Sequence, residues 1–214
     1  MSDNNKINVI KPFGPTIARV KMSIELIHIL NEYVDKIISN EEKIKELNHG
    51  NKLAGSVTQE FKLEEEFIKS SGYKKFLSES VFEWLKMSGL KDIKDFNIIS
   101  SWIVRQFENE YNPIHWHGGH ISGVGYLKVP SSFGETAQPD STKNNQNGNL
   151  ELIYGSRQFL SDASFSITPE VGYFYFFPHY MMHTVYPFNR TKEERRSISF
   201  NATIDEKSYN VYGN

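Results

Sequence analysis

Hydrophobic residues recur at helical spacing in two stretches of the first ninety residues. Ser23 is suited to an N-cap, and the apolar stripe that follows it predicts an amphipathic helix (Ile27, Leu30, Val34, Ile37, Ile38). Residues 74–88 repeat this pattern and Gly89 ends it, which predicts a second helix (Leu77, Val81, Trp84, Leu85). Residues 40–72 are charged and less regular, with Phe61 and Phe67 as expected anchors.

From Asn97 onward the pattern changes to short β-branched and aromatic runs separated by turn residues. The runs predict strands at 98–107, 121–129, 150–153, 165–167, 173–177, 183–186 and 196–204. Many short strands with turns between them are typical of a β-sandwich or barrel. We therefore expect a mainly β fold with flanking α-helices.

The length of 214 residues suits a single domain, 1–214, with a helical part at 1–95 and a β core at 96–205. Residues 130–149 are polar and rich in Pro, Gly, Ser and Asn, which predicts a long surface loop. This loop is equally consistent with a lid over a site and with an insertion that has no role.

Charge and cysteine content narrow the class of protein. The net charge is −2, so no basic excess indicates nucleic acid, and no apolar run approaches the roughly 18 residues that span a bilayer. The chain has no cysteine, which excludes disulfides, thiolate metal sites and a cysteine nucleophile. The first residues lack the basic start and apolar run of a signal peptide. We expect a cytoplasmic protein with neither a nucleic-acid nor a membrane partner.

Three histidines are candidate metal ligands. His115 and His117 would point the same way on an extended strand, and His183 follows a predicted buried strand. Alone, the His-x-His pair also fits two surface histidines beside Gly118-Gly119, and His183 also fits a core histidine bonded to backbone. His120 and His179 are rival ligands, ranked lower because they fit a loop and a turn.

Arg195 and Ser197 are candidates for binding a carboxylate. They share one face of the last predicted strand, and an arginine fork with a nearby hydroxyl can hold both carboxylate oxygens. Arg196 would face the opposite way. The alternative is that 192–196 is a solvated run of charges.

The chain resembles the 2-oxoglutarate (2OG) and Fe(II)-dependent oxygenases, because it contains a His-x-His motif, a distal histidine and an Arg-x-Ser motif in this order. More narrowly, the chain looks like the group found in marine bacteria and their phages, through Ser122-Gly-Val-Gly-Tyr-Leu127, Gly148-Asn-Leu150, Pro178 and Ser197-Ile-Ser-Phe-Asn201. The resemblance is strong over about residues 97–204. It implies a double-stranded β-helix, that is, a cupin-like jelly roll.

The same resemblance implies the chemistry. 2OG and O2 become succinate and CO2 while a substrate C–H bond is hydroxylated, with Fe(II) as cofactor and ascorbate as a supporting reductant. His115 and His183 match the iron-ligand histidines, Arg195 and Ser197 match the pair that binds the distal carboxylate of 2OG, and Tyr126 matches a position that often hydrogen-bonds 2OG. The expected substrate is a small molecule or a peptide, with a prolyl residue as a family-level expectation.

His117 departs from the usual pattern, in which an aspartate or glutamate is the middle ligand. Three neutral histidines compensate less of the Fe(II) charge and also permit zinc. Two other functions therefore stay open: a three-histidine, cupin-type dioxygenase that does not use 2OG, and a non-catalytic metal-binding structural or interaction module. A buried Arg195 would favour an enzyme, whereas an exposed Arg195 would favour the structural module.

Overall fold

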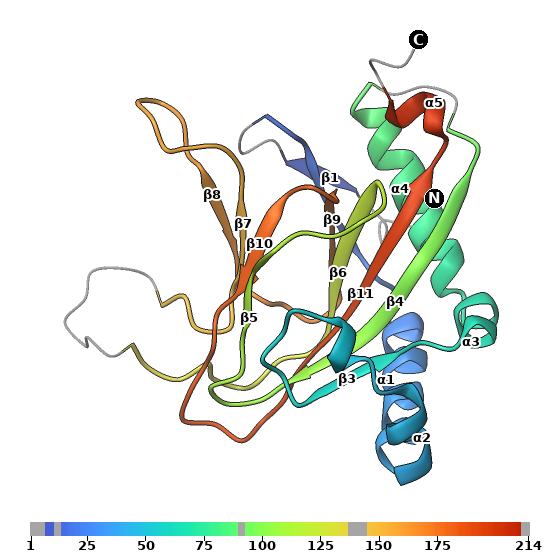
Figure 1. Cartoon of the computed structure of the whole chain (residues 1–214), viewed down its shortest axis with the longest axis vertical. Helices are drawn as coiled ribbons and strands as arrows, with labels where there is room; N and C mark the ends of the chain where they lie inside the picture. Colours follow the sequence, from blue (N-terminus) through green and yellow to red (C-terminus); the bar gives the residue numbers. More distant parts are fainter. Residues whose placement is uncertain (1–6, 11–13, 90–92, 137–144, 211–214) are drawn as a thin grey trace.

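Two antiparallel β-sheets face each other in the computed structural model, which describes residues 7–10, 14–89, 93–136 and 145–210 (Figure 1). Among these residues, a seven-stranded sheet has the order β1-β2-β9-β6-β11-β4-β3 and a four-stranded sheet the order β5-β10-β7-β8. The strands of the larger sheet are β1 (Asn8–Ile10), β2 (Ile17–Lys21), β3 (Gln59–Lys62), β4 (Phe96–Gln106), β6 (Ile121–Lys128), β9 (Tyr173–Pro178) and β11 (Arg195–Ile204). Those of the smaller sheet are β5 (Asn112–His115), β7 (Leu150–Ile153), β8 (Ser164–Ile167) and β10 (Met182–Val185).

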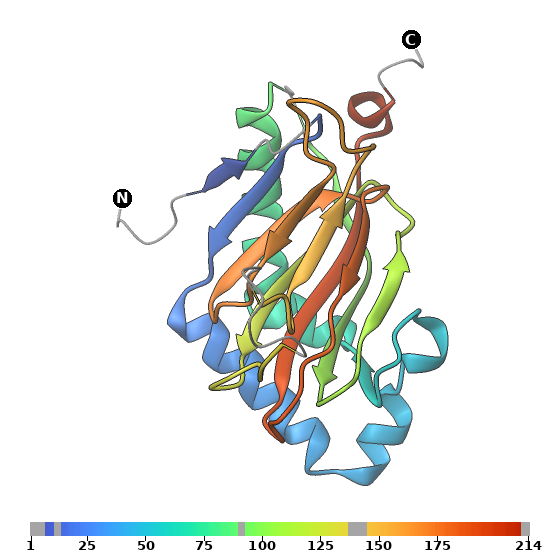
Figure 2. The same cartoon turned by 90° about the vertical axis from the view of Figure 1, so that its left-hand side faces the viewer.

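The helices α1 (Ile24–Ile38), α3 (Glu65–Ser70) and α4 (Tyr73–Met87) cover the face of the larger sheet that is turned away from the smaller one (Figures 1 and 2). The described residues also form α2 (Glu41–Leu47), a 3₁₀ helix (Gly50–Lys52) and the short α5 (Glu206–Tyr209). No helix in the described part of the chain is long and apolar enough to cross a membrane.

The two predicted amphipathic helices are confirmed. The Ser23 hydroxyl accepts a hydrogen bond from the Leu26 N–H at 3.2 Å and so caps α1. α4 ends before Gly89, whose φ of 92° is a conformation that glycine adopts without strain. Both helices bury their apolar stripes against the larger sheet in one hydrophobic core, which includes Leu30, Leu77 and Phe200.

The region 40–72, expected to be irregular, contains α2, β3 and α3. Its elements are short and rich in charge, so hydrophobic periodicity did not reveal them. Phe61 is buried with Ile37 and Leu47, and Phe67 stacks on Tyr33 with ring centroids 3.6 Å apart, so both phenylalanines are anchors as expected. β1 and β2 near the N-terminus are further strands that the pattern did not reveal.

A second core lies between the two sheets and contains Val124, Leu152, Tyr175 and Phe177. The inner face of the larger sheet follows strand alternation. Ser197 on β11 pairs with Val104 on β4 and with Tyr126 on β6, so these residues share that face. Polar residues on this inner face therefore point toward the smaller sheet.

Candidate active site

His115 and His183 lie directly opposite each other on the neighbouring strands β5 and β10 of the smaller sheet. Their ring centroids are 4.2 Å apart. The Nδ1–H of His115 donates to the Pro113 carbonyl at 2.7 Å, and that of His183 donates to the Met181 carbonyl at 2.9 Å. These bonds fix both rings and leave each Nε2 with a free lone pair, as in a metal-ligating histidine.

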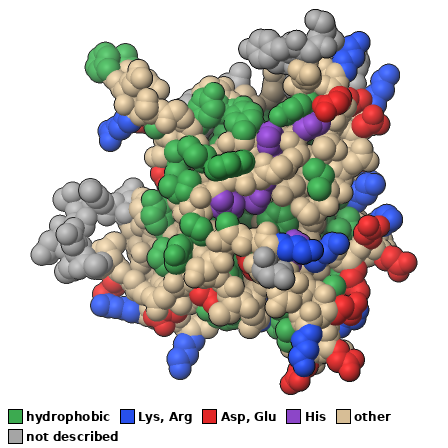
Figure 3. Space-filling model, viewed as in Figure 1, with side chains coloured by type: hydrophobic (Ala, Val, Ile, Leu, Met, Phe, Trp, Pro, Cys, Tyr) green, Lys and Arg blue, Asp and Glu red, His purple; other side chains and the backbone are tan. Residues whose placement is uncertain are grey.

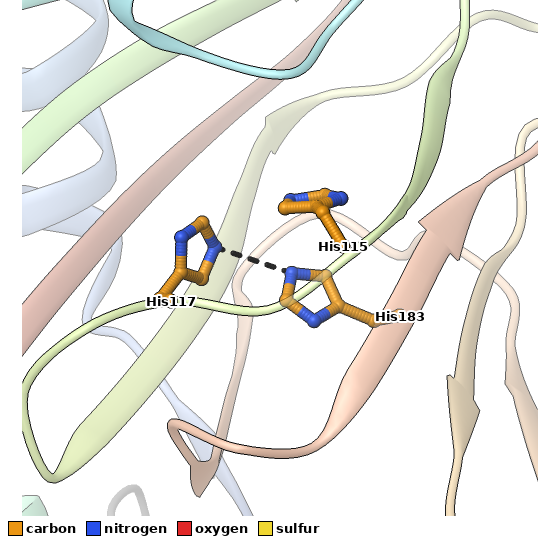
Figure 4. A group of neighbouring side chains, drawn as sticks. All are labelled: His115, His117 and His183. Atoms are coloured by element: carbon orange, nitrogen blue, oxygen red, sulfur yellow. Dashed lines mark hydrogen bonds between the residues drawn. The ribbon is translucent and has the colours of Figure 1, made fainter.

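His117 completes the group, but it does not share a strand with His115. β5 ends at His115, so the expected arrangement on alternate positions of one strand is wrong. The turn after β5 instead carries the His117 ring back to the pair, with its Nε2 3.2 Å from Nε2 of His183 (Figure 4). One ligand nitrogen from each of the three rings lies within 4.8 Å of the others.

One pair of these nitrogens already has the spacing of ligands on a shared metal ion. Metal–nitrogen bonds of about 2.0–2.1 Å place two ligand nitrogens roughly 2.8–3.4 Å apart at octahedral to tetrahedral angles, and the 3.2 Å between the Nε2 atoms of His117 and His183 lies in this range. Burial lowers the pKa of His183 to about 3 and that of His117 to about 4, and it also lowers the pKa of His115. All three rings are therefore neutral at pH 7, which is the form that binds metal.

The rival histidines, His120 and His179, form a different group. The Nε2 of His179 lies 2.7 Å from the hydroxyl of Tyr209, and the His120 ring stacks on the Tyr209 ring. Neither belongs to the group of ligand nitrogens formed by His115, His117 and His183.

A pocket of about 480 Å³, counting its open mouth, lies between the sheets and joins the histidines to Arg195 and Ser197. Its lining comes from both sheets (Trp102, Val104, Asn112, His115, His117, Ser122, Gly123, Val124, Leu150, Phe177, His183, Val185, Arg195, Ser197, Ser199). The structure thus brings five of the six predicted site residues into one cavity, and the sixth, Tyr126, lies beside it.

Arg195 is only 2% exposed, and its Nε and Nη2 have no hydrogen-bond partner among the described residues. Its Nη1 is 3.5 Å from the Ser197 hydroxyl, and no described carboxylate pairs with it. A buried guanidinium without an anion is costly, and burial lowers the pKa of Arg195. These free donors suit a ligand carboxylate.

Tyr126 packs against Arg195 outside the lining of the pocket. The Arg195 guanidinium lies 5.0 Å from the centre of the Tyr126 ring, which is a cation–π contact. The phenol is fully buried, which raises its pKa to about 12, and it has no hydrogen-bond partner among the described residues. Tyr126 therefore lies beside the guanidinium on the inner face of the sheet, and the predicted hydrogen bond from its hydroxyl to 2OG stays a prediction.

Arg196 faces the other way, as the strand phase predicted, but it is also buried and contacts α1. It donates to Asn31 and Asp35 of that helix and to Glu194. The interpretation of 192–196 as a solvated run of charges is wrong for its last two residues.

Sequence reasoning missed Asn112 on β5, which lines the cavity. Trp102, which the sequence suggested as a possible wall of the site, does line it, and its ring meets the His117 ring edge-on with centroids 5.4 Å apart. Trp102 pairs with Ser199 of β11, which places it on the inner face of the larger sheet. Of the 130–149 loop, residues 137–144 lie outside the described residues, and the described remainder contributes nothing to the lining.

Hydrophobic side chains are exposed on the same face of the molecule as the histidines. Histidine side chains reach the surface in the space-filling view, and hydrophobic side chains gather beside them (Figure 3). In the sequence, the exposed Trp116 (66%) lies between two candidate metal ligands and Met182 (39%) precedes the third, but neither lines the pocket.

Comparison with known proteins relates the chain to a family. Residues 100–201 match the sequence model of a family described as "Putative 2OG-Fe(II) oxygenase". This range contains the three histidines, Arg195 and Ser197. No curated protein matches the chain in sequence.

Solved structures with a similar fold include three prolyl hydroxylases. One is a prolyl-4-hydroxylase from Pseudomonas putida, with 16% identity, a TM-score of 0.54 and coverage of 86% of this chain and 91% of that one. Another is a viral collagen prolyl hydroxylase from Paramecium bursaria Chlorella virus-1 in complex with 2OG (13% identity, TM-score 0.55, 87% and 94% covered). The third is a prolyl hydroxylase from Trichoplax adhaerens in complex with a peptide fragment of hypoxia inducible factor (13%, 0.53, 92% and 87%). At these identities the likeness concerns the fold, and it confirms the expected jelly roll with flanking helices.

Proposed function

Since residues 100–201 are a 2OG-Fe(II) oxygenase domain, an oxidoreductase that uses Fe(II) and 2OG, we propose that His115, His117 and His183 are its iron ligands. Three ring nitrogens from two segments converge, and the tautomers of His115 and His183 are set by backbone carbonyls. Three ligands on one side of the ion leave coordination positions for a keto acid and O2. Bound Fe(II) supplies the chemistry that couples the conversion of 2OG and O2 to succinate and CO2 with hydroxylation of a substrate C–H bond.

Arg195 and Ser197 bind the distal carboxylate of 2OG in this proposal. The single observation that carries it is the buried Arg195 guanidinium, whose Nε and Nη2 lack partners among the described residues and which lines the same pocket as the histidines. A carboxylate there satisfies the free donors, and the Ser197 hydroxyl adds another hydrogen bond. Tyr126 holds the guanidinium in place through its ring face.

The His117 position also gives the bound cosubstrate an electrostatic role. With three neutral histidines the ion keeps its full charge of +2 until an anion arrives, whereas a carboxylate ligand would cancel part of it. The keto-acid end of 2OG supplies that anion. We therefore infer that retention of iron and binding of 2OG reinforce each other more strongly here than with an aspartate as the middle ligand.

We propose a peptidyl substrate, with a prolyl residue as the first to test. Two supports favour it: the exposed hydrophobic side chains on the same face as the histidines, and the fold shared with prolyl hydroxylases, one of them solved with a peptide. Exposed apolar and aromatic side chains beside a reactive pocket suit an extended, weakly charged segment of chain.

The two alternative functions, a structural metal site and a cupin-type dioxygenase, differ in how they would use Arg195. A structural metal site has no use for a buried, unpaired guanidinium in its pocket, so the 2% exposure of Arg195 argues against a non-catalytic module. A cupin-type dioxygenase would use Arg195 to hold its own substrate and would form no succinate.

Turnover of 2OG tests the proposal. Purified protein with Fe(II), ascorbate and O2 should convert 2OG to succinate slowly without a substrate and faster with a prolyl peptide, and the His183→Ala variant should form none. Without O2, adding 2OG to the Fe(II) protein should change its visible absorption. Absence of both succinate and the spectral change would contradict the proposal. Substrate oxidation without 2OG would identify the cupin-type reaction.

A further inference from the structure

His117 is held differently from the other two histidines of the cluster. His115 and His183 lie on paired strands, and each ring donates to a nearby carbonyl. His117 lies beyond the end of β5, and no hydrogen bond between its Nδ1 and a described residue fixes its ring. Its position therefore depends on whatever holds its backbone.

His179 holds both sides of the His117 backbone. The N–H of His117 donates to the His179 carbonyl at 3.2 Å. In return, the ring Nδ1–H of His179 donates to the His117 carbonyl at 2.9 Å. The His179 side chain thus replaces the strand pairing that His117 lacks.

Tyr209 of α5 sets the His179 ring in the state that this contact needs. The Tyr209 hydroxyl lies 2.7 Å from Nε2 of His179, and donation to Nε2 leaves the ring proton on Nδ1, where it reaches the His117 carbonyl. The Tyr209 ring is held in turn by stacking on His120, with centroids 3.8 Å apart and planes 6° from parallel. His120 is itself fixed, because its Nδ1 accepts from the Ile204 N–H at 3.1 Å.

We propose that the C-terminal helix α5 positions the metal ligand His117 through the relay Tyr209–His179–His117. The inference rests on the proposed role of His117 as a ligand. Tyr209 and His179 are positioning residues that lie behind the ligand. Their contribution is to hold the His117 ring where its Nε2 meets those of His115 and His183, so loss of the relay weakens metal binding rather than the fold.

Metal affinity tests the relay without requiring turnover. The full chain, freed of metal, is titrated with Co(II), whose visible spectrum reports the geometry of its ligands. Tyr209→Phe removes the hydroxyl but keeps the ring on His120, and it should weaken Co(II) binding about fivefold, the effect of one hydrogen bond. His179→Ala should weaken Co(II) binding about 10- to 100-fold, the usual effect of replacing a residue that hydrogen-bonds a metal ligand.

Two further variants separate positioning from a general effect on structure. His179→Asn keeps an amide N–H near the Nδ1 position and should recover most of the affinity and the Co(II) spectrum. Adding Tyr209→Phe to His179→Ala should cause no further loss, since the relay is already broken. Tyr180→Phe is the matched control, because the Tyr180 ring also contacts His179 but its hydroxyl makes no hydrogen bond to a described residue.

The outcomes are distinct. Weaker Co(II) binding and an altered spectrum in Tyr209→Phe, with an unchanged melting temperature of the metal-free protein, support the relay. Equal affinities of Tyr209→Phe, Tyr180→Phe and the parent chain would overturn it, as would equal losses in His179→Asn and His179→Ala. An unchanged Co(II) affinity in the His117→Ala variant would instead overturn the proposed ligand role of His117.

Discussion

Arg195 and Arg196 are neighbours on β11 and both are almost fully buried, but only Arg196 has carboxylate partners. Arg196 donates to Asp35 at 2.7 Å and to Glu194 at 2.5 Å on the helix side of the larger sheet. Arg195 points to the other side, into the pocket, where no described carboxylate meets it. One strand therefore carries side by side an ion-paired guanidinium and an unpaired one, to which we assign the ligand carboxylate.

Replacing Arg195 should impair 2OG binding without harming the fold. Arg195→Ala removes the charged hydrogen bonds to the distal carboxylate, which we expect to cost about 1.5–3 kcal/mol, or roughly 10- to 100-fold in the KM for 2OG. It also removes a buried charge that lacks an anion, so the free energy of unfolding should stay equal or rise. Urea unfolding without 2OG, together with succinate formation at varied 2OG, checks both effects. A large loss of stability would show that Arg195 is structural.

The opposite result is expected for Arg196. Arg196→Met removes a buried guanidinium from Glu194 and Asp35, which keep Arg105 and Lys128 as cationic partners, so we expect a loss of about 1–3 kcal/mol. Urea unfolding should show this loss, while the KM for 2OG of the remaining folded protein stays within about twofold of the parent value. A raised KM with unchanged stability would reverse the roles given to the two arginines.

Removing His183 should abolish metal retention. His183→Ala deletes the most buried of the three rings and leaves two ligands. Metal affinity should therefore fall by more than about 100-fold, which exceeds the usual loss when a residue that hydrogen-bonds a metal ligand is replaced. The metal retained per chain after dialysis against a weak chelator measures this loss of affinity.

His28→Ala is the control, since His28 is exposed on α1 and pairs only with Glu32 among the described residues. Metal retained by His183→Ala would exclude the three-histidine site.

Glu60 predicts a pH dependence of stability. Its carboxyl group is 1% exposed without a hydrogen-bond partner among the described residues, and burial, with a smaller contribution from the charge of Glu110, raises its pKa to about 7 from an ordinary 4.5. The folded state therefore keeps the proton more tightly than the unfolded state. The resulting stability is present in full below pH 4.5 and is lost as the pH rises through 7.

Glu60→Gln should remove this dependence, because the amide stays neutral. Relative to the parent chain it should be more stable by about 3 kcal/mol at pH 8.5 and nearly equal at pH 4.5. Urea unfolding at both pH values measures the difference. A variant that is equally stable or less stable than the parent at pH 8.5 would show that Glu60 has an unrecognised cationic partner.

Two helices, most strands of the β core and the residue types of the site could be predicted from the sequence, because strand alternation and helical spacing are local properties. The helices after Ser23 and before Gly89 and the alternation Arg195-x-Ser197 are of this kind. The same alternation correctly separated Arg195 from Arg196. Even the resemblance to an oxygenase family depended on short motifs in their order along the chain.

Features set by tertiary contacts could not be predicted in this way. The end of β5 at His115 depends on pairing with β10, so the geometry of His117 was not visible in the His-x-His spacing. β3 is short and charged, and it is a strand because β4 offers its edge. Tyr209 and His179 are far apart in the sequence and meet only when α5 folds back.

The pocket has its two ends on different sheets. The histidines belong to the smaller sheet and the turn after β5, whereas Arg195 and Ser197 belong to β11 of the larger sheet. The span from the histidine cluster to the guanidinium is therefore set by the thickness of the apolar layer formed by residues such as Val124 and Phe177. With the ligand roles proposed above, a change of side-chain volume in this layer should alter which chain length of keto diacid fits, even though no atom that binds the acid has been replaced.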